Sequence, residues 1–178
     1  MSVPFGQLGR YLFNFAVNPM PKVLIFGNSG SGKSTLAKSL AESDGLAHFD
    51  LDTIAWSPAS PPKRMPVMES AKHINHFLAA NSDWVVEGCY ADLIEIASHQ
   101  ATEMIFLNLS VEDCIANARN RPWEPHKYQS VELQNENLEM LLEWIRAYAI
   151  RNDSCSQVVH EKLYNAFKGS KKIVTENE

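Results

Sequence analysis

The sequence predicts a three-layer α/β protein, with a five-stranded parallel sheet between two layers of helices. Short apolar runs of strand-forming residues alternate along the chain with segments that repeat apolar residues at helical spacing. Such alternation is typical of a parallel sheet with helices on both faces. A glycine-rich segment joins the first apolar run to the first helical segment. The 178 residues suffice for one core, so we expect a single main domain.

Five short segments are expected to form the strands. Most of them are apolar runs with β-branched or aromatic residues, as buried parallel strands usually are. They are residues 22–26, 47–49, 84–86, 104–107 and, at one edge of the sheet, 172–174. The segment 57–66 carries four prolines, so we expect it to be irregular.

Apolar residues at helical spacing predict the helices. The first helix should end at Asp44-Gly45, because glycine commonly ends a helix. Another should begin at Ser110, whose side chain suits a helix N-terminus, with Asp113 three residues on. The pattern of the first helix lies in residues 36–41, and further patterns lie in residues 71–78, 93–97, 138–149 and 159–167.

Residues 1–19 are expected to be an N-terminal extension, and the domain is expected to comprise residues 20–178. Met20 lies just ahead of the first strand. The apolar run at 11–17 is too short to span a membrane, and Asn14 interrupts it. We therefore expect no membrane partner.

Composition excludes further classes of partner. A net charge of −5 argues against a general nucleic-acid binder, which needs a basic face. Three cysteines, Cys89, Cys114 and Cys155, form no C-x-x-C pair and fit free thiols in a reducing compartment. We expect a cytoplasmic monomer or dimer.

The glycine-rich segment matches the phosphate-binding loop, G-x-x-x-x-G-K-[ST]. Its glycines allow several backbone N–H groups to point at one anion. Lys33 is expected to reach the outer phosphates, and the Ser34 hydroxyl to bind Mg²⁺. The sequence therefore predicts binding of a nucleoside triphosphate, which we take to be ATP, with Mg²⁺. The loop residues are Gly27, Asn28, Ser29, Gly30, Ser31, Gly32, Lys33, Ser34 and Thr35.

Acidic residues at the ends of strands are candidates for the magnesium site, because carboxylates near Ser34 are needed there. The strand at 104–107 is followed by Asn108, which is neutral. Two other strands end in acids: Asp50 and Asp52 follow the second, and Glu87 follows the third. Alternatively, Asp50 and Asp52 are a helix cap and a surface charge, and Glu87 caps the next helix.

With this loop followed one helix later by Asp50-Leu51-Asp52, the chain resembles the small P-loop kinases of the adenylate kinase and shikimate kinase group, including the topology-modulation-like proteins. The resemblance spans about residues 22–175. We expect the P-loop NTPase fold, with the strands in the order second, third, first, fourth and fifth, and a small lid. The resemblance implies that Asp50 helps to hold Mg²⁺ and that Asp52 binds a hydroxyl of the substrate. It also implies that Glu87 orders a water bound to Mg²⁺.

One arginine is a candidate catalytic residue through the same resemblance. The segment Arg151-Asn152-Asp153 is similar to the Arg-x-Asp-Asp start of a late helix in adenylate kinases, although Ser154 replaces the second acid. There the arginine contacts the phosphates that are transferred. Alternatively, Arg151 is a surface ion-pair residue, and the same choice applies to Arg146.

The lid is expected at about residues 118–130. Phosphoryl transfer needs positive charge around the migrating group and exclusion of water, which a lid provides. This segment follows a helix and concentrates Arg119, Arg121, His126 and Lys127. Arg119 or Arg121 is expected to stabilise the transferred group. Alternatively, the segment is a solvated basic loop.

Departures from the family pattern leave the phosphate acceptor open. Shikimate kinases carry three consecutive glycines where residues 87–90 here read Glu-Gly-Cys-Tyr. No arginine clearly matches the one that binds the carboxylate of shikimate, although Lys63 and Arg64 lie in the same broad region. We expect an ATP-dependent kinase that acts on a small-molecule hydroxyl or a nucleoside monophosphate. The alternative is a regulatory NTP-dependent ATPase or switch, which should expose an apolar patch near Asp52.

Overall fold

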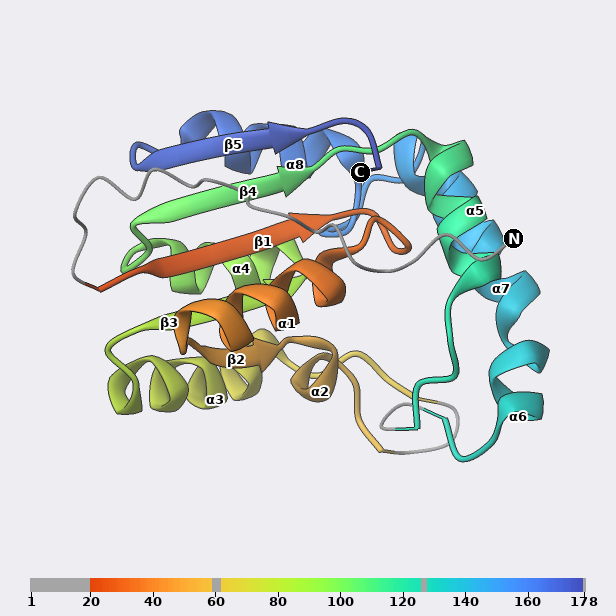
Figure 1. Ribbon diagram of the computed structural model, residues 1–178, viewed down its shortest axis with the longest axis horizontal. Helices are drawn as coiled ribbons and strands as arrows, with labels where there is room; N and C mark the ends of the chain where they lie inside the picture. Colours follow the sequence, from red (N-terminus) through yellow and green to blue (C-terminus); the bar gives the residue numbers. More distant parts are fainter. Residues whose placement is uncertain (1–19, 59–61, 126–127, 178) are drawn as a thin grey trace.

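The sheet of this computed structural model brings the carboxyl ends of all its strands to one edge. The structure describes residues 20–58, 62–125 and 128–177. The strands are β1 (Lys22–Gly27), β2 (Ala47–Asp50), β3 (Trp84–Gly88), β4 (Glu103–Leu107) and β5 (Ser170–Val174). They pair in the order β2-β3-β1-β4-β5, and every pair is parallel (Figure 1). The predicted five-stranded parallel sheet and its strand order are confirmed.

Helices fill both faces of this sheet (Figure 1). One face is covered by α3 (Val67–Ala80), α4 (Ala91–Ser98) and α8 (Gln157–Ala166). The other face is covered by α1 (Lys33–Asp44), α5 (Val111–Asn120) and α7 (Leu138–Arg146). The described chain also contains the short helices α2 (Asp52–Ala55) and α6 (Val131–Glu136) and the 3-10 helix η1 (Ala147–Ala149).

The central strand β1 is buried from both sides. Leu24 and Phe26 pack into the core under α3, α4 and α8, whereas Val23 and Ile25 pack under α1, α5 and α7. All four side chains are at most 1% exposed. Each buried side chain of this size stabilises the fold by about 1.5–3 kcal/mol. This double burial explains why the run at 22–26 is continuously apolar and does not alternate.

The predicted helix ends are confirmed at two positions. Gly45 ends α1 in the left-handed conformation, with φ of 70°. The Ser110 side chain accepts a hydrogen bond of 3.0 Å from the backbone N–H of Asp113 and so caps α5.

Three short elements, α2, α6 and η1, were not predicted. The predicted helix at 138–149 is α7 up to Arg146, after which the chain tightens into η1. This tighter turn accompanies the burial of Tyr148, whose hydroxyl lies 2.8 Å from Nδ1 of His160. The helix α6 was missed because it is short and mostly polar.

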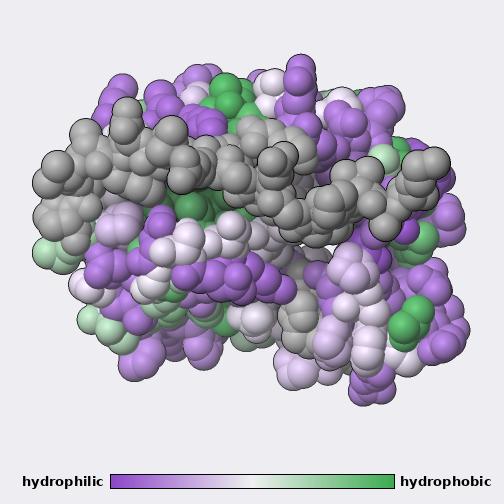
Figure 2. All heavy atoms as spheres, in the orientation of Figure 1, coloured by the Kyte–Doolittle hydropathy of each residue, from purple (hydrophilic) through white to green (hydrophobic). Residues whose placement is uncertain are grey.

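The visible face of the molecule is largely hydrophilic, with a small hydrophobic spot over α6 (Figure 2). In the described part of the chain, no helix combines the length and apolar character that crossing a membrane requires. The expected N-terminal extension, residues 1–19, lies outside the described residues, so the domain boundary at Met20 stays a prediction.

Candidate functional site

The phosphate-binding loop, residues 27–35, connects β1 to α1 at the carboxyl edge of the sheet (Figure 1). Close backbone approaches require glycine at two of its positions. A Cβ atom on Gly27 would lie 2.2 Å from the carbonyl oxygen of Leu107, and one on Gly30 would lie 2.3 Å from that of Cys114. Both residues also have positive φ, which favours glycine. These two glycines of the motif therefore stand at positions where the backbone conformation and the close packing require glycine.

Hydrogen bonds hold this loop in place. The Asn28 amide donates to the carbonyl of Ile145 on α7 at 3.2 Å, and the Asn117 amide on α5 donates to the carbonyl of Gly30 at 2.9 Å. The ammonium of Lys33 donates to the carbonyl of Asn28 at 2.8 Å. These bonds anchor the loop to α5 and α7 and fix its backbone.

Two features of the loop suit an anion. The N-terminus of α1 begins at Lys33, so its first N–H groups and helix dipole face the loop. The Ser31 hydroxyl is buried, and no hydrogen-bond partner for it occurs among the described residues. Buried polar groups rarely lack a partner, so this hydroxyl fits a site that a phosphate completes. Ser34 is half-buried in the first turn of α1, and Thr35 is exposed.

Two of the predicted acids lie next to each other. Asp50, at the end of β2, lies opposite Glu87 in the pairing of β2 with β3. The Glu87 side chain is buried, and its Oε1 lies 3.7 Å from Nε2 of His48. Glu87 does not cap α4, whose N-cap residue is Tyr90 and has no side-chain cap. Among the described residues, no cluster of three or more histidine, cysteine or acidic side chains forms a ready metal cage.

Asp50 and Asp52 both have local partners. The Asp50 carboxylate accepts a hydrogen bond of 2.9 Å from the backbone N–H of Asp52. This bond joins Asp50 to the first residue of α2, but the N-cap residue of that helix is Leu51 and has no side-chain cap, so Asp50 is not the cap that the alternative anticipated. The Asp52 carboxylate accepts a hydrogen bond of 2.8 Å from the Tyr90 hydroxyl, so Asp52 is part of a structured cluster as well as a surface charge.

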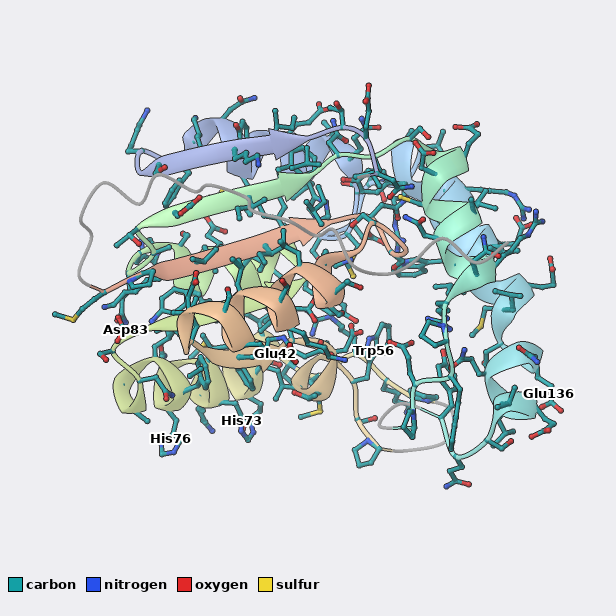
Figure 3. The ribbon with its side chains drawn as sticks, viewed as in Figure 1. Glu42, Trp56, His73, His76, Asp83 and Glu136 are labelled. Carbon is teal, nitrogen blue, oxygen red and sulfur yellow. The ribbon has the colours of Figure 1, made fainter. Side chains whose placement is uncertain are left out.

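Sequence reasoning missed the aromatic residues that surround Asp52. The indole N–H of Trp56 donates to the Tyr90 hydroxyl at 2.7 Å. The Arg64 guanidinium lies over the Tyr90 ring, 4.8 Å from its centroid, and bonds both carboxylate oxygens of Asp92 at 3.1 Å. Trp56 lies beyond α2 at the carboxyl edge of the sheet (Figure 3). The available signal in the sequence was the run Glu-Gly-Cys-Tyr at residues 87–90, directly at the end of the third predicted strand.

Cys89, directly after β3, carries a thiol that is influenced both by the phosphate loop and by Asp52. The pKa of its buried thiol is raised by a hydrogen bond with Cys155 and by burial. The charge of Lys33 lowers this pKa, and the charge of Asp52 raises it. Both charges thus act on one thiol, so Lys33 of the phosphate loop and Asp52 both lie in the neighbourhood of Cys89.

Arg151 lies near the same centre. Burial, together with the charges of Lys33 and Arg151, lowers the pKa of His160 to about 4. The Arg151 guanidinium is paired with Asp153 and lies over the Trp144 ring. Its side chain is only 11% exposed, so Arg151 is not an ordinary surface ion-pair residue.

The predicted lid is only partly described, because His126 and Lys127 lie outside the described residues. Arg119 is exposed in the last turn of α5. Arg121 forms an ion pair of 3.0 Å with Glu124 and faces the Tyr128 ring. The structure therefore shows Arg121 engaged within its own segment.

Other basic residues lie away from this centre. Arg146 forms a surface ion pair with Glu143, as the alternative for it anticipated. His73 and His76 are exposed on α3 (Figure 3).

The loop between a central β1 and α1, in a parallel sheet of this order, defines a P-loop protein. The sequence model of the AAA domain family matches residues 23–142, and the chain belongs to this family. No curated protein sequence matches the chain at a significant level. The predicted P-loop class is confirmed.

Several solved structures are similar to this chain, at low sequence identity. A sugar kinase from Janibacter sp. is 15% identical, with 88% of this chain and 86% of that chain covered and a TM-score of 0.48. A gluconokinase from Sinorhizobium meliloti is 16% identical, with 88% and 84% covered and a TM-score of 0.46. A shikimate kinase from Bacteroides thetaiotaomicron is 16% identical, with 81% and 94% covered and a TM-score of 0.44.

Proposed function

We propose that this protein is a kinase that transfers the γ-phosphoryl group of ATP to a small molecule. The observation that carries the proposal is the phosphate-binding loop between β1 and α1, with Asp50 ending β2 and Asp52 following it at the same carboxyl edge of the sheet. The phosphate loop would hold the donor, and Asp52 would align the acceptor. Phosphoryl transfer depends mainly on such positioning and on charge stabilisation. Residues gathered at one edge of the sheet can therefore supply what the reaction needs.

The donor side of the site would use the loop backbone, Lys33 and the Ser31 hydroxyl. Ser34, Asp50 and Glu87 would hold Mg²⁺ directly or through water, because hard cations prefer oxygen ligands. The neighbouring positions of Asp50 and Glu87 fit this role. Bound Mg²⁺ supplies neutralisation of the charge on the phosphates.

Asp52 would align the acceptor, and the arginines would stabilise the transferred phosphoryl group. Arg151 is proposed to contact the transferred group, since its charge and that of Lys33 act on the same imidazole. Arg119 and Arg121 are proposed to close over the site from the lid. Arg121 would first exchange its ion pair with Glu124 for the phosphoryl oxygens.

The test is an ADP-release assay with ATP and Mg²⁺ across nucleoside monophosphates, shikimate, gluconate and neutral polyols. One acceptor class should raise the rate above basal hydrolysis, and Asp52→Ala should abolish the stimulation while ATP still binds. Lys33→Ala supplies the blank. Lys38→Ala, an exposed lysine of the same helix, is the matched control. A rate that no acceptor raises would contradict the kinase proposal.

A second candidate is a regulatory ATPase whose shape change is sensed by a protein partner. It is favoured by the exposed apolar residues beside α2, namely Trp56, Val67 and Met68, which are 39%, 40% and 74% exposed. Slow ATP hydrolysis, at a rate that no small acceptor changes, would favour this candidate over the kinase.

A further inference from the structure

The hydrogen bonds around Tyr90 have a fixed direction. The indole N–H of Trp56 can only donate, so at 2.7 Å the Tyr90 oxygen must accept from it. The Tyr90 proton is then directed to Oδ1 of Asp52, 2.8 Å away. The three side chains form a chain of donors that ends on the carboxylate proposed to align the acceptor.

Tyr90 itself is firmly placed. Its carbonyl accepts hydrogen bonds of 3.0 and 2.9 Å from the N–H groups of Leu93 and Ile94, which starts α4 directly after β3. Its side chain is nearly buried, at 4% exposure for the residue. The ring also lies under the Arg64 guanidinium. Movement of the hydroxyl would disturb each of these contacts.

The hydroxyl keeps its proton at all ordinary pH values. Burial raises the pKa of Tyr90, and the nearby Cys89 and Asp52 raise it further. Tyr90 is therefore a permanent neutral donor to Asp52. A donor of this kind fixes the orientation of a carboxylate without adding a positive charge to the site.

Among the described residues, the arginine in contact with Tyr90 is paired with an acid of its own. Arg64 bonds both oxygens of Asp92 and donates to the carbonyl of Ala55 at 3.1 Å. Lys63, beside it, is exposed to solvent. These contacts set a neutral hydroxyl donor and an aromatic side chain beside the Asp52 carboxylate, and Arg64 serves as a clamp on Tyr90. A carboxylate repels an anionic acceptor but accepts a hydrogen bond from a hydroxyl.

We infer that Tyr90, with Trp56, is a positioning residue that fixes Asp52 for a hydroxyl of an uncharged polyhydroxy acceptor. This inference rests on the proposed kinase function and narrows it. It selects the hydroxyl acceptor over the nucleoside monophosphate.

The acceptor class is tested with three six-carbon compounds that share a skeleton and differ in charge: glucitol, gluconate and glucitol 6-phosphate. AMP is added as the nucleoside monophosphate. Glucitol should stimulate ADP release most strongly in the wild-type protein. A stronger response to gluconate, glucitol 6-phosphate or AMP would overturn the inference. No response to any of them would count against the proposed function itself.

The role of Tyr90 is tested with Tyr90→Phe, which keeps the ring under Arg64 and removes only the hydroxyl. The acceptor kcat/KM should fall about tenfold to a hundredfold, the loss expected for a hydrogen bond to a charged group, while the KM for ATP stays unchanged. Tyr164→Phe, on α8, is the matched control and should change neither constant. Equal effects of Tyr90→Phe on both substrates would overturn the assignment.

A double-mutant cycle separates positioning from a general structural role. In the Asp52→Asn background, the loss caused by Tyr90→Phe should shrink at least threefold, because the charged acceptor of the hydrogen bond is gone. The same loss in both backgrounds would show that Tyr90 acts independently of Asp52. If Tyr90→Phe does not fold, Trp56→Phe tests the same series of hydrogen bonds. Trp56 is 39% exposed, so its replacement disturbs the core less. It should lower the acceptor kcat/KM by a smaller factor, and no change would overturn the inference.

Discussion

The Arg151 guanidinium lies flat against Trp144, with its central carbon 3.3 Å from the centroid of the ring. Asp153 holds the same guanidinium from the side, and the backbone N–H of Cys155 donates to the other carboxylate oxygen of Asp153 at 2.9 Å. Trp144 lies on α7, whereas Asp153 and Cys155 lead into α8. Arg151 is therefore preorganised where these two helices meet, near Lys33.

Arg151→Ala should lower turnover at least tenfold, because removing a fixed positive charge near the transferred group weakens its stabilisation. Arg151→Lys should recover little, since an ammonium cannot lie flat on an indole and bond Asp153 in the same way. The assay is ADP release with the best acceptor. Arg146→Ala removes an exposed arginine of a surface ion pair and is the matched control. Equal activity of Arg151→Ala and Arg146→Ala would contradict this prediction.

Gly30→Ala should destabilise the protein more than Gly45→Ala. Both glycines have positive φ, which costs a non-glycine residue about 1–2 kcal/mol. Around Gly45 no atom lies within 4 Å of the added Cβ, whereas at Gly30 it would meet the backbone of Cys114. The midpoints of urea unfolding compare the two variants directly. Equal midpoints would show that the loop shifts to accommodate the methyl group at little cost in stability.

Glu87→Gln should separate stability from activity. Oε1 of Glu87 is buried and has no hydrogen-bond partner among the described residues, and Nε2 of His48, at 3.7 Å, is too far away to supply one, so the oxygen loses its hydration without a hydrogen bond in return. The free energy of unfolding should therefore stay constant or rise by about 1 kcal/mol. The Mg²⁺ concentration for half-maximal ADP release should rise, because a carboxylate is lost from the proposed site.

Glu42→Gln, on the exposed face of α1, is the control for both measurements (Figure 3). EDTA should stop turnover in the wild-type protein. A Glu87→Gln variant that loses stability and keeps its Mg²⁺ dependence would assign Glu87 a structural role only.

The sequence was informative wherever a signal is local. The run at 22–26, the spacing of the loop motif and Ser110 can each be read from a short stretch of sequence, and the strand, the loop between strand and helix, and the helix start are confirmed. The partners of Asp52 were beyond sequence reasoning, because Tyr90 lies 38 positions away and reaches it only through the fold. The same holds for Arg151 and Lys33, whose charges converge on His160 through packing of α8. Resemblance indicated Asp52 and Arg151 as candidates, and tertiary contacts define their surroundings.

His160 makes the stability of the fold depend on pH. The carbonyl of Cys89 can only accept, so Nε2 of His160 carries a proton and donates to it at 2.8 Å. Nδ1 then accepts from Tyr148 at 2.8 Å. The neutral ring is fully bonded, and burial lowers the pKa of His160 to about 4. The unfolded chain keeps the ordinary pKa of about 6.5.

Between these two pKa values the unfolded state binds a proton that the folded state does not. The free energy of unfolding should therefore fall as the pH falls from about 6.5 toward 4, by roughly 1.4 kcal/mol per pH unit. Urea unfolding at pH 7 and pH 5 should show a loss of about 2 kcal/mol from this residue. His160→Gln, which cannot titrate, should be less stable at pH 7 and should lack this part of the slope. His73→Gln, at an exposed position of α3, should keep the wild-type slope. An identical slope in His160→Gln would mean that other groups cause the acid sensitivity.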